Sequence, residues 1–501
     1  MAVVPGGPRS GPAAGAQFFC TAGRGLEPFL MREVRERLAA TQVEYISGKV
    51  FFTTCSDLNM LKQLKSAERL FLLIKKQLPF PVSSVSKGKI FNELQRLIND
   101  DPESWLYAIS IWKNLLELDA KKEKLPHKNA NPLKRKVGDD DIAAKKLKTE
   151  QIQEIQETKE CQLEKQIEGK ILEQGNFISE EEKFRELQND VTEAVVTHNQ
   201  TNLTFRVSCR CSGAIAKTFT AQEIGRIIGI ALMKQFGWKA DLRNPNLEIF
   251  IHLSDIYSVL GIPMFRVPLA CRAYIKTAGM RSTIAWAMAS LAEIKAGAVV
   301  LDPMCGLGTI LLEAAKEWPD VYYVGADVSD SQLSGAYDNL RAAGLKDKIE
   351  LLKVSVIELP LPSESVDIII SDIPFGKKFK LGKDIKRTLQ EMERVLRVGG
   401  TIVLLLSEDH HRHLKGGEAS SGPLNSQGGH TEEPGGEECL TPAGKAAGSE
   451  PVSSSFAASN QECLDRMSPL GSLVPVDCYR VSLGKTDALI SKYKKSYSPG
   501  R

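Results

Sequence analysis

Apolar residues follow two different spacings along the C-terminal part of the chain. Five apolar runs have the length of strands, at residues 297–302, 321–327, 349–354, 366–372 and 401–408. Segments with a helical period, such as TILLEAAKEW and DIKRTLQEMERVL, separate most of them. Strands that are apolar throughout and alternate with helices predict a parallel sheet covered on both faces. The predicted fold is α/β and Rossmann-like, and its ligands should bind at the carboxyl ends of the strands.

Changes in composition divide the chain into segments. Lys, Glu, Asp and Gln dominate residues 118–180, which predicts a charged linker, whereas Gly, Ser, Pro and Glu dominate residues 416–460, which predicts a disordered insertion. The expected order is a disordered N-terminus (1–16), an N-terminal domain (17–117), the linker, a third domain (181–266) and the Rossmann-like domain (267–501) with its insertion.

Bulk composition limits the location and the partners. The chain has 501 residues and a net charge of +3, so any surface that binds nucleic acid must be local. The ten cysteines are scattered without a C-x-x-C pair, which predicts reduced thiols, and no apolar run reaches about 18 residues, so we expect an intracellular protein with no membrane segment. Two basic clusters flank an acidic spacer in residues 132–148, which favours the nucleus, with the cytoplasm as a further location. The histidines of EDHHRH (408–413) lack a spaced partner, so we expect no metal site.

The first two strand ends suit a nucleoside ligand. After the first strand, LDPMCGLGT (301–309) contains Gly306 and Gly308, which let the backbone pass close to a ligand before a helix begins. Asp327 ends the second strand, where a carboxylate can accept both ribose hydroxyls. The loop lacks the third glycine of a dinucleotide fingerprint, and Asp302 would repel a pyrophosphate but can hold an ammonium group. This pattern favours S-adenosylmethionine over NAD.

The third strand ends at Ser355, where many such folds place an acid for the adenine amine; a hydroxyl accepts that hydrogen bond more weakly. The predicted cofactor-binding residues are Asp302, Cys305, Gly306, Gly308, Thr309, Asp327 and Ser355.

The fourth strand ends in an acid, a proline and an aromatic residue, in SDIPFGKK (371–378). Asp372 and the carbonyl of Ile373 can accept the hydrogens of an exocyclic amine and so aim its lone pair at the cofactor methyl group. Pro374 stiffens the loop, and Phe375 can stack on the base that carries the amine. We predict that these four residues form the catalytic motif.

These motifs resemble those of the THUMP-containing RNA guanosine N2-methyltransferases. FFCTAGRGLEPFLMREV (18–34) is similar to the opening of their ferredoxin-like domain, LTFRVSCRCSG and the residues after it to their THUMP module, and CRAYIKTAGMRSTIAWAMASLA to their approach to the cofactor loop. The resemblance implies a methyltransferase domain preceded by a ferredoxin-like plus THUMP RNA-binding half. It also implies methylation of guanosine N2 in a structured RNA. Transfer RNA is the usual substrate class of that family, and the basic clusters that favour the nucleus equally allow a small nuclear RNA. Ser355 and the insertion depart from the family pattern.

The resemblance also implies a partner, a small zinc-binding activator protein that adds a strand beside the sheet. The predicted insertion begins just past Glu408 and should leave the sheet edge less protected there, which favours such a partner.

Basic residues gather in the part that resembles the THUMP module. In LTFRVSCRCS (203–212) apolar and polar positions alternate, so one strand face can offer guanidinium groups to phosphates. The predicted RNA-binding residues are Arg206, Arg210, Lys217, Arg226, Lys239 and Arg243.

Two other functions remain open. The D-x-P-F motif is also similar to that of methyltransferases for adenine N6 or a glutamine side chain, although the basic N-terminal half argues against a protein substrate. A methyltransferase fold without turnover could also serve as an RNA-binding scaffold, although the intact set of Asp302, Gly306, Gly308 and Asp327 argues against it.

Overall fold

The computed structural model describes residues 15–46, 48–80, 87–124, 203–374, 385–415, 453–484 and 486–497. They belong to two compact units. One comprises residues 1–15 and 106–199, of which Gly15 and most of one long helix are described. The other comprises residues 16–105 and 200–501, and it contains both sheets of the protein.

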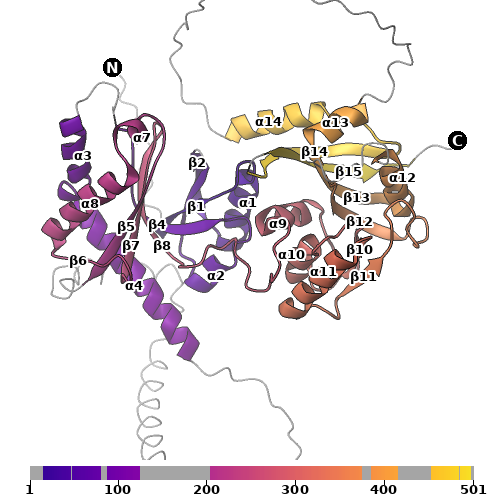
Figure 1. Cartoon of the computed structure of the whole chain (residues 1–501), viewed down its shortest axis with the longest axis horizontal. Helices are drawn as coiled ribbons and strands as arrows, with labels where there is room; N and C mark the ends of the chain where they lie inside the picture. Colours follow the sequence, from indigo (N-terminus) through magenta and orange to yellow (C-terminus); the bar gives the residue numbers. More distant parts are fainter. Residues whose placement is uncertain are drawn as a thin grey trace, which may run out of the picture. The chain divides into compact units, whose positions relative to one another are not determined.

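The first sheet has eight strands in the order β2-β3-β1-β4-β8-β7-β5-β6 (Figure 1). Its strands are β1 (Ala16–Thr21), β2 (Thr41–Ile46), β3 (Lys49–Thr54), β4 (Arg69–Gln77), β5 (Thr204–Cys211), β6 (Lys239–Ala240), β7 (Leu247–Leu253) and β8 (Ser258–Pro263). The helices of this part are α1 (Glu27–Leu38), α2 (Leu58–Lys62), α3 (Lys87–Asn99), α4 (Pro102–Lys124), α7 (Ala214–Thr218) and α8 (Ala221–Phe236). Because β4 pairs antiparallel with β8, the ferredoxin-like and THUMP segments share one continuous sheet.

Helix α8 shows how local sequence sets these elements. Thr220 and Glu223 form a reciprocal capping box at its start, and Gly237 ends it with a φ of 70°, a left-handed conformation that suits glycine. Its buried residues recur at helical spacing, so one apolar stripe faces the core. They are Ile224, Ile227, Ile228, Ala231 and Leu232.

The second sheet has seven strands in the order β11-β10-β9-β12-β13-β15-β14. Its strands are β9 (Val299–Asp302), β10 (Tyr322–Asp327), β11 (Ile349–Lys353), β12 (Val366–Asp372), β13 (Leu396–Ser407), β14 (Leu473–Ser482) and β15 (Asp487–Lys495). The helices are α9 (Ser282–Leu291), α10 (Thr309–Glu317), α11 (Asp330–Ala343), α12 (Ile385–Val395), α13 (Glu408–Lys415) and α14 (Ser453–Asp465). Strands β9 to β13 are parallel, as the five apolar runs predict, and the β14–β15 hairpin is antiparallel.

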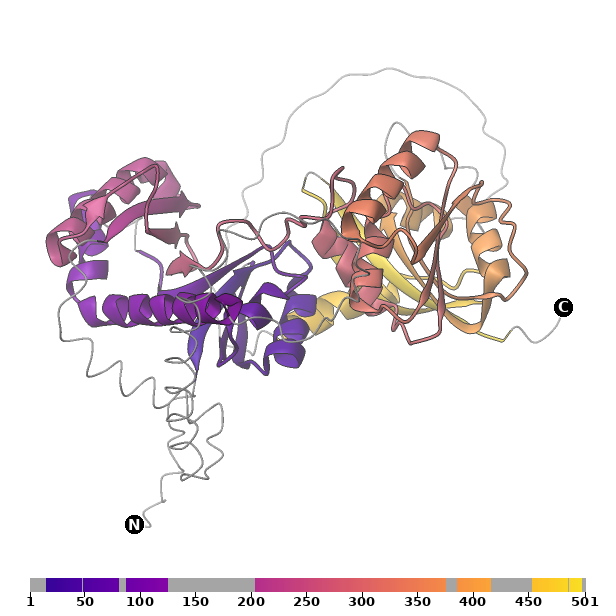
Figure 2. The same ribbon diagram turned by 90° about the horizontal axis from the view of Figure 1, so that it is seen from below.

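Both faces of the second sheet are buried by helices (Figures 1 and 2). Ile368 and Ile370 of β12 belong to a core shared with α9, α10 and α11, whereas Ile369, between them, belongs to a core shared with α12. This alternation follows from the two-residue repeat of a strand. The Rossmann-like, α/β fold class is confirmed.

The structure differs from several expectations based on the sequence. Helix α14 extends into the range 416–460 expected as an insertion, and α4 continues to Lys124, past the expected end of the N-terminal domain. Cys463 and Cys478 form a disulfide between α14 and β14, although the scattered cysteines predict reduced thiols, because α14 packs on that strand. The basic clusters at 132–148 lie outside the described residues. Among the described helices, none has the length and apolar character needed to cross a membrane.

Candidate active site

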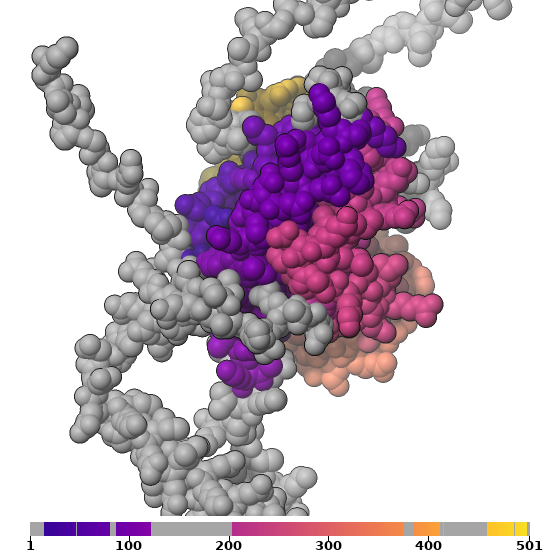
Figure 3. Space-filling view, turned by 90° about the vertical axis from the view of Figure 1, so that its left-hand side faces the viewer, coloured from indigo at the N-terminus to yellow at the C-terminus, as the bar shows by residue number. Residues whose placement is uncertain are grey.

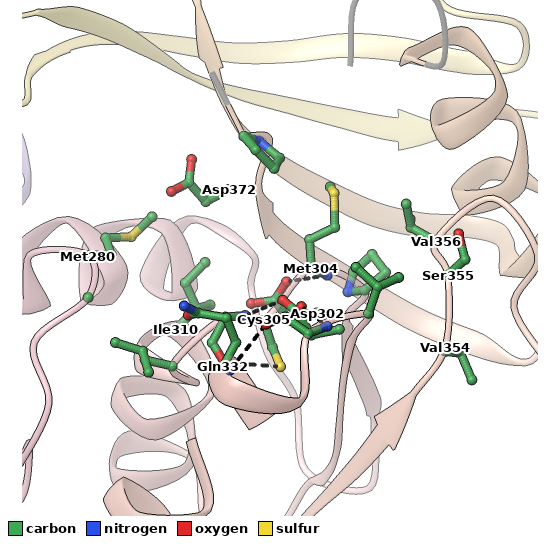
Figure 4. A pocket seen from close by; sticks show the side chains of 18 of the residues that line it. Met280, Asp302, Met304, Cys305, Ile310, Gln332, Val354, Ser355, Val356 and Asp372 are labelled. Atoms are coloured by element: carbon green, nitrogen blue, oxygen red, sulfur yellow. Dashed lines mark hydrogen bonds between the residues drawn. The ribbon is translucent and has the colours of Figure 1, made fainter. Parts of the chain in front are cut away.

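A cavity of about 680 Å³ lies at the carboxyl ends of the parallel strands of the second sheet (Figure 4). Its wall comes from the loops after β9, β10, β11 and β12, from Gly279 and Met280 before α9, and from Thr388 of α12. In Figure 4, Met280 lies on one side of the cavity, and Ser355 and Val356 lie on the opposite side, with Asp302 and Cys305 between them. The polar residues predicted at the strand ends therefore lie at the edge where an open parallel sheet binds its ligands.

The glycine loop after β9 has two left-handed residues, Gly306 (φ 50°) and Gly308 (φ 75°). Gly306 lines the cavity, so its missing side chain permits the close approach that the sequence predicts. At Gly308 an added Cβ would instead lie 3.5 Å from Ala336 and from Leu340 of α11. Gly308 is therefore needed for the turn into α10, and it does not line the cavity as Gly306 does.

Asp327, at the end of β10, is held in a fixed orientation. Its Oδ2 accepts a hydrogen bond from the Gly306 amide (3.0 Å), and its Oδ1 accepts one from the Ser329 amide (2.9 Å). Each carboxylate oxygen can accept a second hydrogen bond. The residue lines the cavity, so its remaining acceptor capacity suits a pair of ribose hydroxyls.

Asp302, at the end of β9, is the most deeply buried acid of the cavity wall. Only 1% of it is exposed, and its Oδ1 accepts hydrogen bonds from the Ser371 hydroxyl (2.9 Å) and the Met304 amide (3.2 Å). Burial raises the pKa of Asp302 to about 7, and the neighbouring Asp372 and Asp327 carboxylates act in the same direction. A cationic ligand group beside Asp302 would favour its ionised form.

Asp372, at the end of β12, also has a pKa raised to about 7 by burial. Its Oδ1 is a buried acceptor without a hydrogen-bond partner among the described residues. Pro374 lines the cavity beside it. The side chain of Ile373 is fully buried in the core, and its amide donates to the Leu405 carbonyl (3.1 Å), so only its carbonyl can serve a ligand and that role stays a prediction. Phe375 lies outside the described residues.

Two threonines of the wall resemble Asp372 in having a buried oxygen without a partner in the described part of the chain. They are Thr309, in the first turn of α10, and Thr388 of α12. A buried polar atom left unsatisfied costs about 1–3 kcal/mol, so three of them around one cavity fit a ligand rich in polar groups. Apolar side chains of Met304, Val354 and Val356 complete a surface suited to a planar base. The wall therefore fits S-adenosylmethionine, with its ammonium, hydroxyl and adenine groups.

Some of the wall has no signal in the sequence. Thr388 occupies an ordinary position in a helix, next to the buried Leu389, and Gln332 lies in the first turn of α11. Ser371 does not line the cavity but bonds to Asp302, which does; it lies one residue before the predicted motif, and the bond depends on the pairing of β9 with β12. Only the tertiary structure gives these three residues a place in or beside the cavity.

The predicted RNA-binding residues differ in how available their charges are. Arg206 forms an ion pair with Glu248 on β7 (2.7 Å), so its charge is partly neutralised. Arg210, Lys217, Arg226, Lys239 and Arg243 are exposed. The pKa of Lys49 is lowered to about 8, mainly by burial and secondly by repulsion from the Arg210 charge. Lys49 is therefore a second basic side chain near Arg210. Figure 3 shows the face where α3 meets the β5–β8 segment (magenta).

Comparisons with known proteins agree with this geometry. Residues 270–415 match the model of the RMKL-like methyltransferase domain, and residues 181–261 match that of the THUMP domain. The U6 snRNA (guanine-N(2))-methyltransferase THUMPD2 of Bos taurus is 93% identical over 501 residues, and that of Homo sapiens is 76% identical over 502 residues; each comparison covers 100% of both chains. The crystal structure of TrmN from Thermus thermophilus has the same fold, with a TM-score of 0.56, 19% identity and coverage of 96% of this chain and 99% of that one.

Burial of Asp302 and Asp372 predicts that the protein without ligand loses stability as the pH rises. Each carboxyl has an ordinary pKa of 3.8 and a folded-state pKa of about 7, so the folded state binds more protons between these values. This stabilisation is fully present below about pH 4 and is lost as the pH rises through about 7. Thermal unfolding at about pH 5 and about pH 8 should show a smaller difference in the Asp302→Asn/Asp372→Asn variant than in wild type. Equal differences would contradict this, and exposed Asp338→Asn serves as the control.

The geometry of Asp327 predicts a loss of affinity when its carboxylate is removed. Asp327→Ala should weaken binding of S-adenosylhomocysteine by about 1.5–3 kcal/mol, the scale of hydrogen bonds to a charged group. Isothermal titration calorimetry measures this directly. Asp330→Ala removes an exposed acid three residues away that pairs with Lys353, and it should bind like wild type. An Asp327→Ala variant with wild-type affinity would remove this residue from the cofactor site.

Proposed function

We propose that the substrate of this chain is U6 small nuclear RNA. The premise is its family: the chain belongs to the THUMP-containing guanine-N2 RNA methyltransferases. The enzyme uses S-adenosylmethionine to methylate the exocyclic N2 amine of guanosine in a structured RNA. The choice of U6 rests on one observation: relatives of that name match this chain along its full length at 93% and 76% identity. Their names favour guanine N2 over adenine N6 or a glutamine side chain, and the cavity favours an enzyme over an RNA-binding scaffold.

Different residues of the cavity suit different groups of the cofactor. Asp302, buried and beside Ser371, suits the ammonium group, and Asp327 suits the ribose hydroxyls. Thr309 can form a hydrogen bond with the polar end of the cofactor's methionine moiety. Ser355, on the opposite side of the cavity from Met280, suits the adenine amine of the cofactor (Figure 4). When bound, S-adenosylmethionine supplies an electrophilic methyl group.

Asp372 is the residue best placed to prepare the guanine amine. The N2 lone pair is delocalised into the base, so the amine is a poor nucleophile and alignment matters more than basicity. The Oδ1 of Asp372, which has no hydrogen-bond partner among the described residues, can accept an N2 hydrogen and fix the direction of the lone pair. Transfer of a methyl group to nitrogen releases one N2 proton, and a carboxylate whose pKa is raised to about 7 can accept it.

The N-terminal half contributes the surface for RNA. Its five exposed basic residues, from Arg210 to Arg243, support phosphate contacts, and the continuous sheet holds the ferredoxin-like and THUMP segments together. We propose a nuclear location, with the cytoplasm as a further one. The support is the pair of basic clusters in residues 132–148, outside the described part of the chain.

A small zinc-binding activator protein is the second proposed partner, but the expected docking edge needs correction. The insertion after Glu408 was expected to expose a sheet edge, yet β13, which ends at Ser407, lies inside the sheet between β12 and β15. The edge strands are β11 and β14. Residues of the N-terminal half already contact β14: the rings of Phe29 and Tyr479 meet at a tilt of 52° with centroids 4.7 Å apart, and the Ser482 amide donates to the Arg24 carbonyl (2.9 Å).

Strand β11 is therefore the edge we propose for the activator. Leu351 and Leu352 are only half-buried there. A groove of about 470 Å³ runs beside the strand, and its lining includes Tyr337 and Leu340 of α11. Tyr337 is 49% exposed, a large aromatic side chain at a surface where a strand could be added.

Removal of the Asp372 carboxylate should slow the chemical step. Asp372→Ala should reduce the rate on the order of 10², a typical penalty for losing a positioning contact, while affinity for S-adenosylhomocysteine stays nearly unchanged. Single-turnover kinetics and nucleoside mass spectrometry of the RNA measure rate and product. N2-methylguanosine made by wild type supports the proposal. N6-methyladenosine would replace guanine with adenine as the target, and no product from wild type together with its activator would favour the scaffold.

A charge in the groove beside β11 should impair the activator complex. Tyr337→Glu is expected to weaken binding by about 2 kcal/mol or more, the scale of a buried aromatic anchor at an interface. Tyr322→Glu changes a more exposed tyrosine (69%) outside the groove lining and should bind normally. Co-purification and titration with the activator test both. Wild-type affinity of Tyr337→Glu would exclude this groove as part of the docking site.

A further inference from the structure

Asn339 of α11 is a fully buried amide whose hydrogen-bonding capacity is completely used. None of its surface is exposed. Its Oδ1 accepts from the amides of Lys276 (2.8 Å) and Thr277 (3.0 Å), and its Nδ2 donates to the carbonyls of Thr277 and Leu307 (both 3.1 Å). An amide has two acceptor and two donor positions, so all four are satisfied.

These bonds join two segments that both form the cofactor cavity. Lys276 and Thr277 belong to residues 271–281, here named the strap, which leads from the N-terminal half into α9 and contributes Gly279 and Met280 to the cavity wall. Leu307 lies between Gly306 and Gly308 in the glycine loop. Asn339 itself does not line the cavity, so it can act on a ligand only through the strap and the loop.

The strap and the glycine loop pack without spare room. A Cβ added to Gly279 would lie 3.3 Å from Thr309 Oγ1 and 3.4 Å from Leu307 Cβ. On the other side of the loop, a Cβ added to Gly335 of α11 would lie 2.5 Å from Leu307 Cδ2. The Leu307 side chain is therefore held between the strap and α11.

The other end of the strap is anchored to α10. Arg272 pairs with Glu313 (3.1 Å), and both side chains are almost completely buried, at 5% and 0% exposed. The Tyr274 hydroxyl donates to the same carboxylate (2.7 Å), and Arg272 also donates to the Lys65 carbonyl of the N-terminal half (2.8 Å). Anchors on α10 and α11 thus fix the strap on either side of the glycine loop.

We propose that Asn339 is a positioning residue for the cofactor. By bonding the strap and Leu307 at once, it holds Gly279 and Met280 at the distance from Thr309 and Gly306 that the ligand requires. The inference rests on the proposed function only in taking S-adenosylmethionine as the ligand of this cavity. It adds a residue that lies outside the cavity and touches neither cofactor nor RNA.

Two substitutions separate the bonds. Asn339→Leu has a similar volume but removes all four hydrogen bonds, so two backbone amides and two backbone carbonyls lose their Asn339 partner. Asn339→Asp retains acceptors for the Lys276 and Thr277 amides but places a carboxylate oxygen against the Thr277 and Leu307 carbonyls, so it loses the one bond to the glycine loop and keeps two of the three bonds to the strap. The adjacent Asp338→Asn, an exposed position on the same helix, is the matched control.

The test measures S-adenosylhomocysteine binding by calorimetry without RNA, together with the rise in Tm that the ligand produces. For Asn339→Leu and Asn339→Asp we expect the dissociation constant to increase on the order of tenfold or more, the scale of one to two hydrogen bonds, and the ligand-induced rise in Tm to shrink. The KM for S-adenosylmethionine should rise more than kcat falls, and the affinity for RNA should be unchanged. Hydrogen exchange at Leu307 and Gly308 should become faster.

A purely structural role gives a different result. In that case the variants melt at a lower temperature, but the dissociation constant and the ligand-induced rise in Tm remain those of wild type, and the inference is overturned. If Asn339→Leu does not fold, Asn339→Asp decides by the same criterion. If wild type itself does not bind S-adenosylhomocysteine, the proposed function fails, and the inference about Asn339 fails with it. If wild type binds and both variants bind equally well, only the inference about Asn339 fails.

Discussion

Two carboxylates buried at the ends of apolar strands are the constraint on which the rest of the site depends. A sheet covered by helices on both faces leaves its polar chemistry only at the strand ends, and there Asp302 and Asp372 are removed from water. Burial of a charge without a partner is strongly unfavourable, so these groups remain partly protonated at neutral pH until a ligand supplies compensating contacts. The same burial that raises their pKa values makes the cavity selective for a ligand with a cationic end and an amine to be held.

How much of this site can be predicted depends on whether the signal is local. Asp302, Asp327 and Asp372 end apolar runs, so the sequence indicates both the strand and the residue that ends it, and Gly306 follows the first of these runs within a short loop. The fold class follows from the same alternation. Thr388, Ser371 and Asn339 give no such signal, because a threonine or asparagine on a helix and a serine within a strand acquire a role only from what the neighbouring strands and helices bring beside them.

Two features of sheet topology escape the sequence for a similar physical reason. Composition separates the ferredoxin-like and THUMP segments by a long charged stretch, but the pairing of β4 with β8 is a non-local contact that no composition records. Likewise, the order of the second sheet puts β13 in its interior, so an interruption after that strand leaves no edge exposed. Gly308 shows the same limit at the scale of one residue: its sequence position suits contact with a ligand, while its left-handed φ of 75° serves the turn into α10.

The strap contacts both the N-terminal half and the methyltransferase domain, and it also lines the cofactor cavity. Arg272 bonds to the Lys65 carbonyl of the N-terminal half and to Glu313 of α10, and a few residues later Lys276 and Thr277 bond to Asn339. Hydrogen bonds therefore hold the strap at both ends, to the Lys65 carbonyl at Arg272 and to Asn339 at Lys276 and Thr277, and Asn339 also bonds to Leu307 of the glycine loop. The strap is thus part of the cavity wall as well as the connection between the N-terminal half and the methyltransferase domain.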